Sequence, residues 1–275
     1  MKLALSLLAL ATTIQAPAAT AADRIYTVGI VPQFDTRKIH AIWRPIIEAL
    51  EQRTGLTFKL LGKPTIPDFE RALANDEFDF AYINPYSAVA PSTGPHCVPL
   101  AREHGTQLYG ILVVHKDNPL QNPQDLETQK IAFPAPNALG ATLMIKADLE
   151  DLHQTHVDAE YVLTHSSVYF NVALGRAIAG GGVQKTLQEQ PPAIRDKLRV
   201  LYRTRSVAPH PFCAHSRVPK SVRRHVQDQL LALGSTPAGQ QLLTKVPIQR
   251  IGPATMTDYQ PLLEMNLQRY YTESH

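Results

Sequence analysis

Phe133-Pro-Ala-Pro-Asn-Ala-Leu-Gly-Ala-Thr142 joins a short apolar strand to an amphipathic helix through a Pro-Asn turn. Pro136 cannot continue a helix and Asn137 is a good N-cap residue, so we expect the helix to begin directly after them. The next amides then have no acceptor within the helix and lie at its positive end; they belong to Ala138, Leu139, Gly140 and Ala141. This arrangement predicts a cradle for a phosphate-like oxyanion. An ordinary capped helix with nothing bound is the alternative.

The first 22 residues have the pattern of a secretory signal peptide. Lys2 precedes an apolar core from Leu3 to Ile14, and small residues end at Ala22. This pattern predicts export to a bacterial periplasm. No other stretch approaches the about 18 uninterrupted apolar residues of a membrane-spanning helix. The remaining 253 residues (275 − 22) suffice for one large domain or two lobes.

Charge and cysteine content limit the classes of partner. The formal net charge is +3 and the Lys and Arg residues are scattered, so nucleic acid is not the expected partner. The chain has two cysteines, Cys97 and Cys213, which are 116 positions apart (213 − 97). In an oxidising compartment a disulfide is the default interpretation, although spacing alone does not prove that the two lie close together.

Strand-like and helix-like patterns alternate along the chain. Strands are predicted at 26–31, 57–61, 78–83, 97–102, 108–115, 130–133, 159–163 and 198–202, and helices at 39–54, 66–75, 139–152, 168–178, 193–197, 221–233, 237–244 and 259–271. The alternation restarts after residue 115, which predicts an α/β fold with two mostly parallel sheets flanked by helices. Segments 104–115 and 203–214 are the candidate hinge strands. The second returns the chain beside the strand that begins at Cys97, which would bring Cys213 within its reach.

Several motifs together resemble the periplasmic substrate-binding proteins of phosphate, phosphite and phosphonate ABC importers. They are Val31-Pro-Gln33, Trp43-Arg-Pro45, Asp79-Phe-Ala-Tyr-Ile-Asn84, Gly110-Ile-Leu-Val-Val114 with Lys116-Asp117, and Asp125-Leu126 before Ile131-Ala-Phe-Pro-Ala-Pro-Asn137. The resemblance implies the two-lobed type II periplasmic-binding fold with a two-strand hinge. The expected organisation is a signal peptide at 1–22, lobe 1 at 23–108 and 210–275, and lobe 2 at 109–209. It also implies a monomer without cofactor or metal.

The resemblance places ligand contacts at two helix starts of lobe 2. Phosphonate-binding relatives open the first helix with Ser-Thr-Ser, whereas this chain has Ala138, Leu139 and Gly140, which leaves Thr142 as the nearest hydroxyl. His165, with Ser166 and Ser167, matches the position where a family histidine reaches the anion; capping or packing is its alternative role. His210 and Lys185 stand near positions where aminophosphonate binders have acidic residues, so a cationic amine tail is disfavoured. His210 is also a candidate ligand residue, because it would add a positive charge beside the hinge when protonated; a rigid hinge residue is its alternative role.

On the first lobe, candidate ligand residues lie at the carboxyl ends of predicted strands, where open α/β sheets bind ligands. They are Thr65, Ile66, Tyr82, Asn84 and Tyr86. Tyr82 has a core position as its alternative. The Gly180-Gly-Gly182 run is predicted to form a tight turn after the preceding helix and lacks the Lys-Ser/Thr of a nucleotide-binding loop.

These observations favour a non-catalytic receptor that captures a small oxyanion by hinge closure and delivers it to an ABC permease. The alternative is a periplasmic sensor of an oxyanion or a metalloid that signals to a histidine kinase; a free Cys97 would favour the metalloid form. An enzyme is the third class, but no His-Glu-x-x-His, Gly-x-Ser-x-Gly or Cys-x-x-Cys spacing is present. His210, Cys213 and His215 would form a tight metal site only if the strand bends at Pro211.

Overall fold

The computed structural model describes residues 24–91, 96–246 and 248–272. The predicted signal peptide at 1–22 lies outside these residues. Within the described part of the chain, no helix is long and apolar enough to span a membrane.

A six-stranded sheet organises the first half of the fold, which we call lobe 1. Its strand order is β11-β4-β10-β3-β1-β2, where the strands are β1 (Ile25–Ile30), β2 (Thr57–Leu61), β3 (Phe80–Tyr82), β4 (Cys97–Glu103), β10 (Phe212–His215) and β11 (Ile251–Pro253). Strand β1 pairs in parallel with β2 and β3, whereas β10 runs antiparallel to β3 and β4, and β11 antiparallel to β4.

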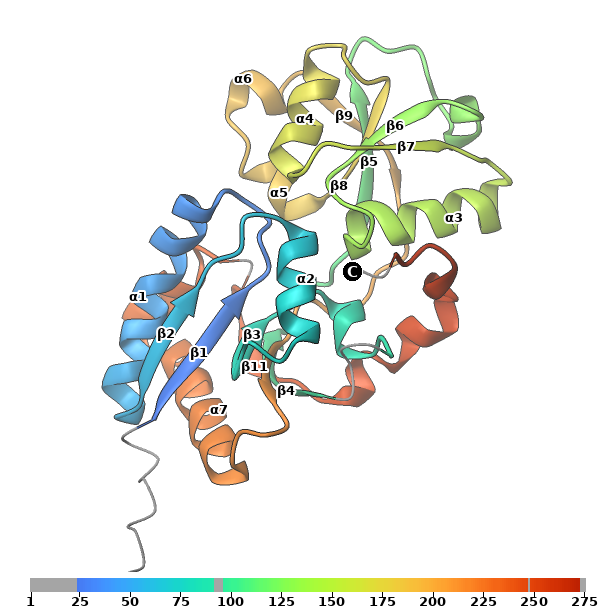
Figure 1. The fold of residues 1–275 in the computed structure, drawn as a ribbon. Helices are drawn as coiled ribbons and strands as arrows, with labels where there is room; N and C mark the ends of the chain where they lie inside the picture. The colour runs from blue at the N-terminus through green and yellow to red at the C-terminus, as the bar shows by residue number, and fades with distance from the viewer. Residues whose placement is uncertain (1–23, 92–95, 247, 273–275) are drawn as a thin grey trace, which may run out of the picture.

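Helices α1 (Thr36–Thr54) and α7 (Lys220–Gly234) cover one side of this sheet and α2 (Ile66–Ala74) the other (Figure 1). The short helix α8 (Pro237–Leu243) packs against α1 and α7. Helix α1 begins after Asp35, whose carboxylate accepts from the amide of Lys38, and ends at Gly55 in the left-handed region with φ 70°. Its apolar stripe is fully buried and consists of Ile39, Trp43, Ile46, Ile47 and Leu50.

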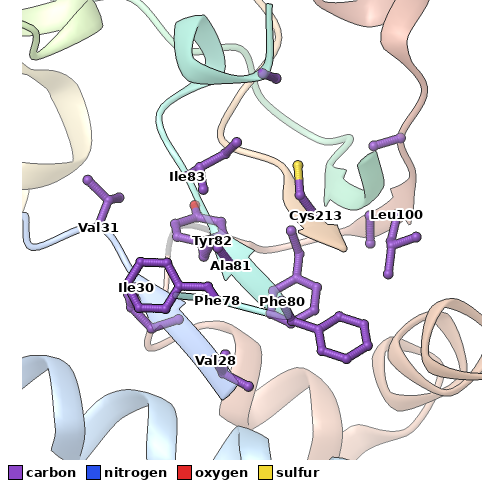
Figure 2. Close-up of a cluster of buried hydrophobic side chains, with 14 of the residues drawn as sticks. Val28, Ile30, Val31, Phe78, Phe80, Ala81, Tyr82, Ile83, Leu100 and Cys213 are labelled. Carbon is purple, nitrogen blue, oxygen red and sulfur yellow. The ribbon is translucent and has the colours of Figure 1, made fainter. Parts of the chain in front are cut away.

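The core of lobe 1 lies at the centre of the sheet. Val28 and Ile30 of β1 meet Phe80 and Tyr82 of β3 there, and Cys213 of β10 lies beside them (Figure 2). Phe80 stacks on Phe212 with ring centroids 6.1 Å apart. Because these strands are buried on both faces, their positions are tightly fixed relative to one another.

A five-stranded sheet organises the second half, lobe 2, in the order β7-β6-β8-β5-β9. The strands are β5 (Gly110–His115), β6 (Lys130–Phe133), β7 (Asp158–Tyr161), β8 (Ala179–Val183) and β9 (Leu198–Arg203); the helices are α3 (Met144–His153), α4 (His165–Ala173), α5 (Gln184–Gln188) and α6 (Pro192–Arg195). Alternate residues of β5 face opposite sides: Leu112 and Val114 pack in one core cluster, Ile111 and Val113 in another. The strand predicted at 108–115 is present at Gly110–His115 and is buried on both faces.

The chain crosses between the sheets twice, after β4 and after β9. The two crossings lie side by side, because the amide of Leu108 donates to the carbonyl of Val207 at 2.9 Å and the amide of Val207 donates back at 2.8 Å. The predicted boundaries at 108/109 and 209/210 fall within these crossings. Such a pair of adjacent connections is a typical hinge between two lobes.

The α/β class and the two sheets are confirmed, but three details of the prediction are wrong. The sheets are mixed rather than mostly parallel, because the strands that follow the crossings, β5 in lobe 2 and β10 in lobe 1, pair antiparallel with their neighbours. Gly180-Gly-Gly182 lies inside buried strand β8 instead of a turn. Residues 259–271 form short 3₁₀ turns instead of one helix, because Asn266 adopts the left-handed φ of 50° between them.

A disulfide joins Cys97 of β4 to Cys213 of β10 across adjacent antiparallel strands, with Cα atoms 5.6 Å apart. The return strand therefore does lie beside the strand that begins at Cys97. The bond closes a chain segment of 116 residues, and it restricts the unfolded chain accordingly.

Gly181→Ala tests the tight packing of β8. A Cβ atom at this position would lie 2.0 Å from the carbonyl oxygen of Ala141 and 2.5 Å from the ring of Phe133. We expect the free energy of unfolding to fall by about 3 kcal/mol, measured by urea denaturation followed by circular dichroism. Gly175→Ala is the control: its φ is 69° but nothing lies within 4 Å of the added atom, so about 1 kcal/mol is expected. Equal losses in the two variants would contradict the role of close packing.

Candidate functional site

Three helix starts and the returning crossing line a narrow cavity between the lobes, which we call the inner cavity. Lobe 1 and the returning crossing line it with Val31, Gln33, Ile66, Asn84 and His210, and lobe 2 lines it with Ala138, Leu139, Gly140, Ala141, His165 and Val183. Its volume is about 20 Å³. By this measure a cavity needs about 10–15 Å³ to hold one water molecule, so the inner cavity suits only a very small group unless the lobes separate.

The helix after Pro136 opens with a π-helical turn at Leu139–Leu143 that continues into α3. Its wide winding is marked by the amides of Leu143 and Met144, which donate to the carbonyls of Ala138 and Leu139. Among the described residues, the amides of Leu139, Gly140 and Ala141 have no acceptor. These amides lie at the positive end of the helix and beside the inner cavity.

Asn137 does not cap this helix, so that part of the prediction is wrong. Ala138 occupies the N-cap position without a side-chain hydrogen bond. The Asn137 amide group instead donates to Glu70 Oε2 at 2.8 Å and to the Thr272 carbonyl at 2.6 Å, and its oxygen accepts from the Thr272 amide at 2.9 Å. These partners lie on lobe 1 and on the C-terminal segment, so Asn137 connects the lobes and does not line the inner cavity.

The second helix start, that of α4, contributes His165. Thr164 caps the helix, because its hydroxyl accepts from the amide of Ser167 at 3.0 Å. His165 is 3% exposed and its Nδ1 lies 3.4 Å from the hydroxyl of Thr186. No described residue bonds to its Nε2, which leaves that nitrogen available at the cavity.

The hydroxyls predicted to reach a ligand are engaged elsewhere. Ser166 Oγ accepts from Gln190, Ser167 Oγ pairs with Thr164, and the buried hydroxyl of Thr142 donates to the carbonyl of Ala135 at 2.8 Å. None of the three lines the inner cavity. The backbone amides and His165 are therefore the polar groups that lobe 2 presents there.

The candidate residues on lobe 1 fall into those that line the inner cavity and those that do not. Ile66, at the start of α2, and Asn84 line the inner cavity, whereas Thr65 caps α2 by accepting from the amide of Asp68. Asn84 Nδ2 donates to the carbonyl of Asn137 at 2.6 Å, a second bond between the lobes. Tyr86 is buried against the ring of Tyr271, with centroids 5.4 Å apart, and does not line the inner cavity.

His210 reaches the inner cavity from the returning crossing. Gln33 Nε2 lies 3.1 Å from its Nε2; because the amide donates, the imidazole nitrogen accepts and its proton sits on Nδ1. The ring stacks on Tyr82 with centroids 5.4 Å apart. Tyr82 itself lines a larger neighbouring cavity of about 440 Å³, the outer cavity, which shares Gln33, Val183 and His210 with the inner one.

The inner cavity carries no full charge on its described lining. No Asp, Glu, Lys or Arg lines it. Burial lowers the pKa of His165 to about 4, and burial together with the charge of His165 lowers the pKa of His210 to about 3. Both imidazoles are therefore neutral near pH 7, and the cavity offers dipoles and hydrogen bonds.

Sequence reasoning missed Val183, and it used Val31 and Gln33 only as parts of a motif. All three line the inner cavity. The one available signal was position, since Val31 and Gln33 follow the carboxyl end of β1, where ligands bind in such sheets. Val183 gave no signal, because an apolar residue at the end of a buried strand looks like core.

A metal site at His210, Cys213 and His215 is excluded because Cys213 is held in the disulfide. Within the described chain, one group has metal-like spacing: Asp76, His96 and His215. His215 already uses both ring nitrogens: Nδ1 accepts from the Arg217 amide at 3.0 Å and Nε2 lies 2.8 Å from Asp76 Oδ1. The hydrogen bond that His215 donates to this carboxylate holds the pKa of Asp76 below its usual value.

A family model described as the periplasmic substrate-binding protein of a phosphonate ABC transporter matches residues 28–259. The chain belongs to this family. The predicted family resemblance is thereby confirmed. A sequence search of curated proteins finds no match.

Solved structures show the same fold. A binding protein component of an ABC phosphonate transporter from Pseudomonas aeruginosa is 14% identical, with a TM-score of 0.76 over 90% of this chain and 87% of that one. PhnD1 from Prochlorococcus marinus in complex with methylphosphonate is 14% identical, with a TM-score of 0.79 over 89% and 98%. A Xanthomonas citri protein bound to ATP is 14% identical, with a TM-score of 0.73 over 90% and 99%. These likenesses confirm the type II periplasmic-binding fold.

The two buried histidines predict a specific pH dependence of stability for this family member. In the unfolded chain each imidazole binds a proton below pH of about 6.5, whereas in the folded chain it stays neutral down to its lowered pKa. The unfolded state therefore binds more protons as the pH falls, and stability falls with it. Between pH 7 and pH 5 we expect each histidine to contribute about 2 kcal/mol of this loss.

The measurement is urea unfolding of the wild type and of the His165→Gln/His210→Gln double variant across this pH range. The double variant should show the flatter profile, because glutamine does not titrate. His40→Gln, at an exposed position of α1, controls for a general effect of removing a histidine. Parallel profiles for wild type and double variant would show that the histidines are not neutral in the folded protein.

Proposed function

We propose that this protein is the periplasmic receptor of an ABC importer and that it binds a small phosphorus oxyanion in the inner cavity. The family to which the chain belongs supports a transport role with a membrane permease as partner, and it supports a periplasmic location. The pattern of a signal peptide at residues 1–22 agrees with that location. Under this proposal the protein binds its ligand without converting it.

The observation that carries the proposal is the convergence of three helix starts on one cavity. Ile66, the Leu139–Ala141 backbone and His165 all line it, and each stands at a positive helix end. Free amides at such ends bind anionic oxygens directly. His165 Nε2 and the side chain of Asn84 add hydrogen-bonding groups from opposite lobes.

The composition of the lining favours an anion of low charge. No cation lines the described inner cavity, and Ala138, Leu139 and Gly140 carry no hydroxyl. Each charge-assisted hydrogen bond that such a hydroxyl would make contributes about 1.5–3 kcal/mol. A small, singly charged species such as hypophosphite or a monoprotonated phosphite or phosphonate therefore fits better than a fully ionised phosphate.

The metalloid form of the sensor alternative does not agree with the disulfide. Capture of a metalloid by a free thiol needs an unpaired cysteine, and both cysteines of this chain are in the disulfide. Signalling of a bound oxyanion to a histidine kinase stays an untested prediction, and no structural feature favours it over delivery to a permease.

Isothermal titration calorimetry with phosphite, hypophosphite, phosphate, methylphosphonate, sulfate, arsenite and arsenate tests the proposal. We expect binding of one or more phosphorus oxyanions. His165→Ala should weaken that binding by about 10- to 100-fold, because it removes one hydrogen bond to a charged oxygen. His40→Ala, at an exposed position of α1, is the matched control and should bind like the wild type.

Two results would overturn the proposal. One is the absence of binding for every phosphorus oxyanion, and the other is binding that His165→Ala leaves unchanged. Binding of arsenite alone would point to thiol chemistry and would require the Cys97–Cys213 bond to open.

A further inference from the structure

The outer cavity continues directly from the inner one and is much larger, at about 440 Å³ against about 20 Å³. They share Gln33, Val183 and His210 as a common wall. A volume in this range holds a small organic group. A substituent on an anion held at the helix starts therefore has room toward the outer cavity.

The walls of the outer cavity are rich in primary amides. Five glutamines line it: Gln33, Gln107, Gln184, Gln188 and Gln249. An amide offers both donors and an acceptor, which is the pattern needed to bind hydroxyl groups. Three hydroxyl side chains, Thr106, Thr186 and Ser206, extend the same chemistry.

Charge in the outer cavity argues against a cationic substituent. Among the described residues no carboxylate lines it, and the one charged residue that does is Lys185. Lys185 Nζ lies 3.0 Å from Glu189 Oε1, so its charge is already paired and gives little attraction for a second anion. The Arg203 guanidinium lies over the ring of Tyr109, another wall residue, at 5.4 Å from its centroid. An ammonium group would find no counter-ion here.

One wall residue has an unused acceptor. Gln184 Nε2 donates to the carbonyl of Gln107 at 2.8 Å, which fixes the orientation of the side chain. Its Oε1 atom is buried and has no hydrogen-bond partner. A buried carbonyl oxygen without a donor is costly, and a rotation of this side chain that brings Oε1 to the surface of the outer cavity would let a hydroxyl or N–H group of a ligand donate to it.

A residue outside the outer cavity holds two of its wall loops in place. The buried carboxylate of Glu103 accepts from the amides of Gly105, Thr106, Gln249 and Arg250. These contacts tie the loop after β4 to the loop before β11, and each loop contributes a wall residue. Glu103 itself does not line the cavity. The fold itself therefore holds the walls of the outer cavity in position.

We propose that the outer cavity binds an uncharged, hydroxyl- or amide-bearing organic substituent of the ligand, so that the natural substrate is a polyhydroxylated phosphonate or phosphate monoester. This inference rests on the proposed function, because the anionic group is placed at the helix starts. Gln184 supplies the acceptor that selects such a substituent. Ligands with an ammonium or a carboxylate at the same place bind more weakly.

The test compares phosphonates that share one head group. Calorimetric titrations would use methylphosphonate, ethylphosphonate, 2,3-dihydroxypropylphosphonate, 2-aminoethylphosphonate and phosphonoacetate. The dihydroxypropyl compound should bind about tenfold more tightly than ethylphosphonate, and the amine and the carboxylate should not exceed ethylphosphonate. Glycerol 3-phosphate, added as a separate arm, distinguishes a phosphate monoester from a phosphonate as the source of the anion.

Gln184→Ala locates the effect. It should remove most of the advantage of the dihydroxypropyl compound and leave methylphosphonate binding unchanged, since methylphosphonate does not reach the outer cavity. Gln52→Ala, an exposed glutamine on α1, is the matched control. A thermal unfolding curve like that of the wild type shows that each variant is folded.

The outcomes separate this inference from the function on which it rests. Methylphosphonate binding with no preference for the diol, or with a preference for 2-aminoethylphosphonate, overturns the inference and leaves the proposed function intact. A diol preference that survives in Gln184→Ala overturns the role of Gln184. Failure of every phosphonate and of glycerol 3-phosphate to bind overturns the inference, and the proposed function falls with it only if phosphite, hypophosphite and phosphate also fail to bind.

Discussion

The backbone of the helix start lies directly on the sheet of lobe 2, and the inner cavity depends on that contact. A Cβ atom on Gly110 would lie 2.0 Å from the carbonyl oxygen of Gly140, and one on Gly181 would lie 2.0 Å from that of Ala141. Side chains at these positions would lift the helix off β5 and β8. Their absence lets the first turn settle against the strands with its free amides at the lobe interface.

That placement also explains the electrostatic character of the cavity. The amides of a helix start are fixed dipoles, so an anion there is stabilised without a buried cation. A buried lysine or arginine would add attraction but would cost desolvation whenever it was unpaired. Neutral His165 and His210 avoid this cost because burial lowers the pKa of each. Selection among ligands then depends on the number and direction of the hydrogen bonds that each ligand makes. This suits a substrate-binding protein that must release its ligand.

The sequence predicted most of the fold because its periodic signals are strong. The five buried residues of α1 and the unbroken apolar run of β5 leave little choice of structure. Asn84 and Ile66, which line the inner cavity, were selected by the rule that ligands bind at the carboxyl ends of strands in open α/β sheets. Asn137 was misassigned because its partners Glu70 and Thr272 lie 67 and 135 residues away. Gly180–Gly182 looked like a turn because the need for glycine comes from Tyr169 and Ala141, which no local pattern reveals.

Asn137 makes closure of the lobes partly a property of the protein itself. Its side chain bonds Glu70 and both backbone groups of Thr272, while its carbonyl accepts from Asn84. Each such bond contributes about 0.5–1.5 kcal/mol net, so together they favour the closed arrangement without any help from a ligand. A ligand must then supply only the remaining difference between open and closed states. Because Asn137 stands two residues before the free amides at 139–141 and is not among them, the contacts between the lobes and the proposed anion contacts use different atoms of one turn, and either can be altered by mutation without removing the other.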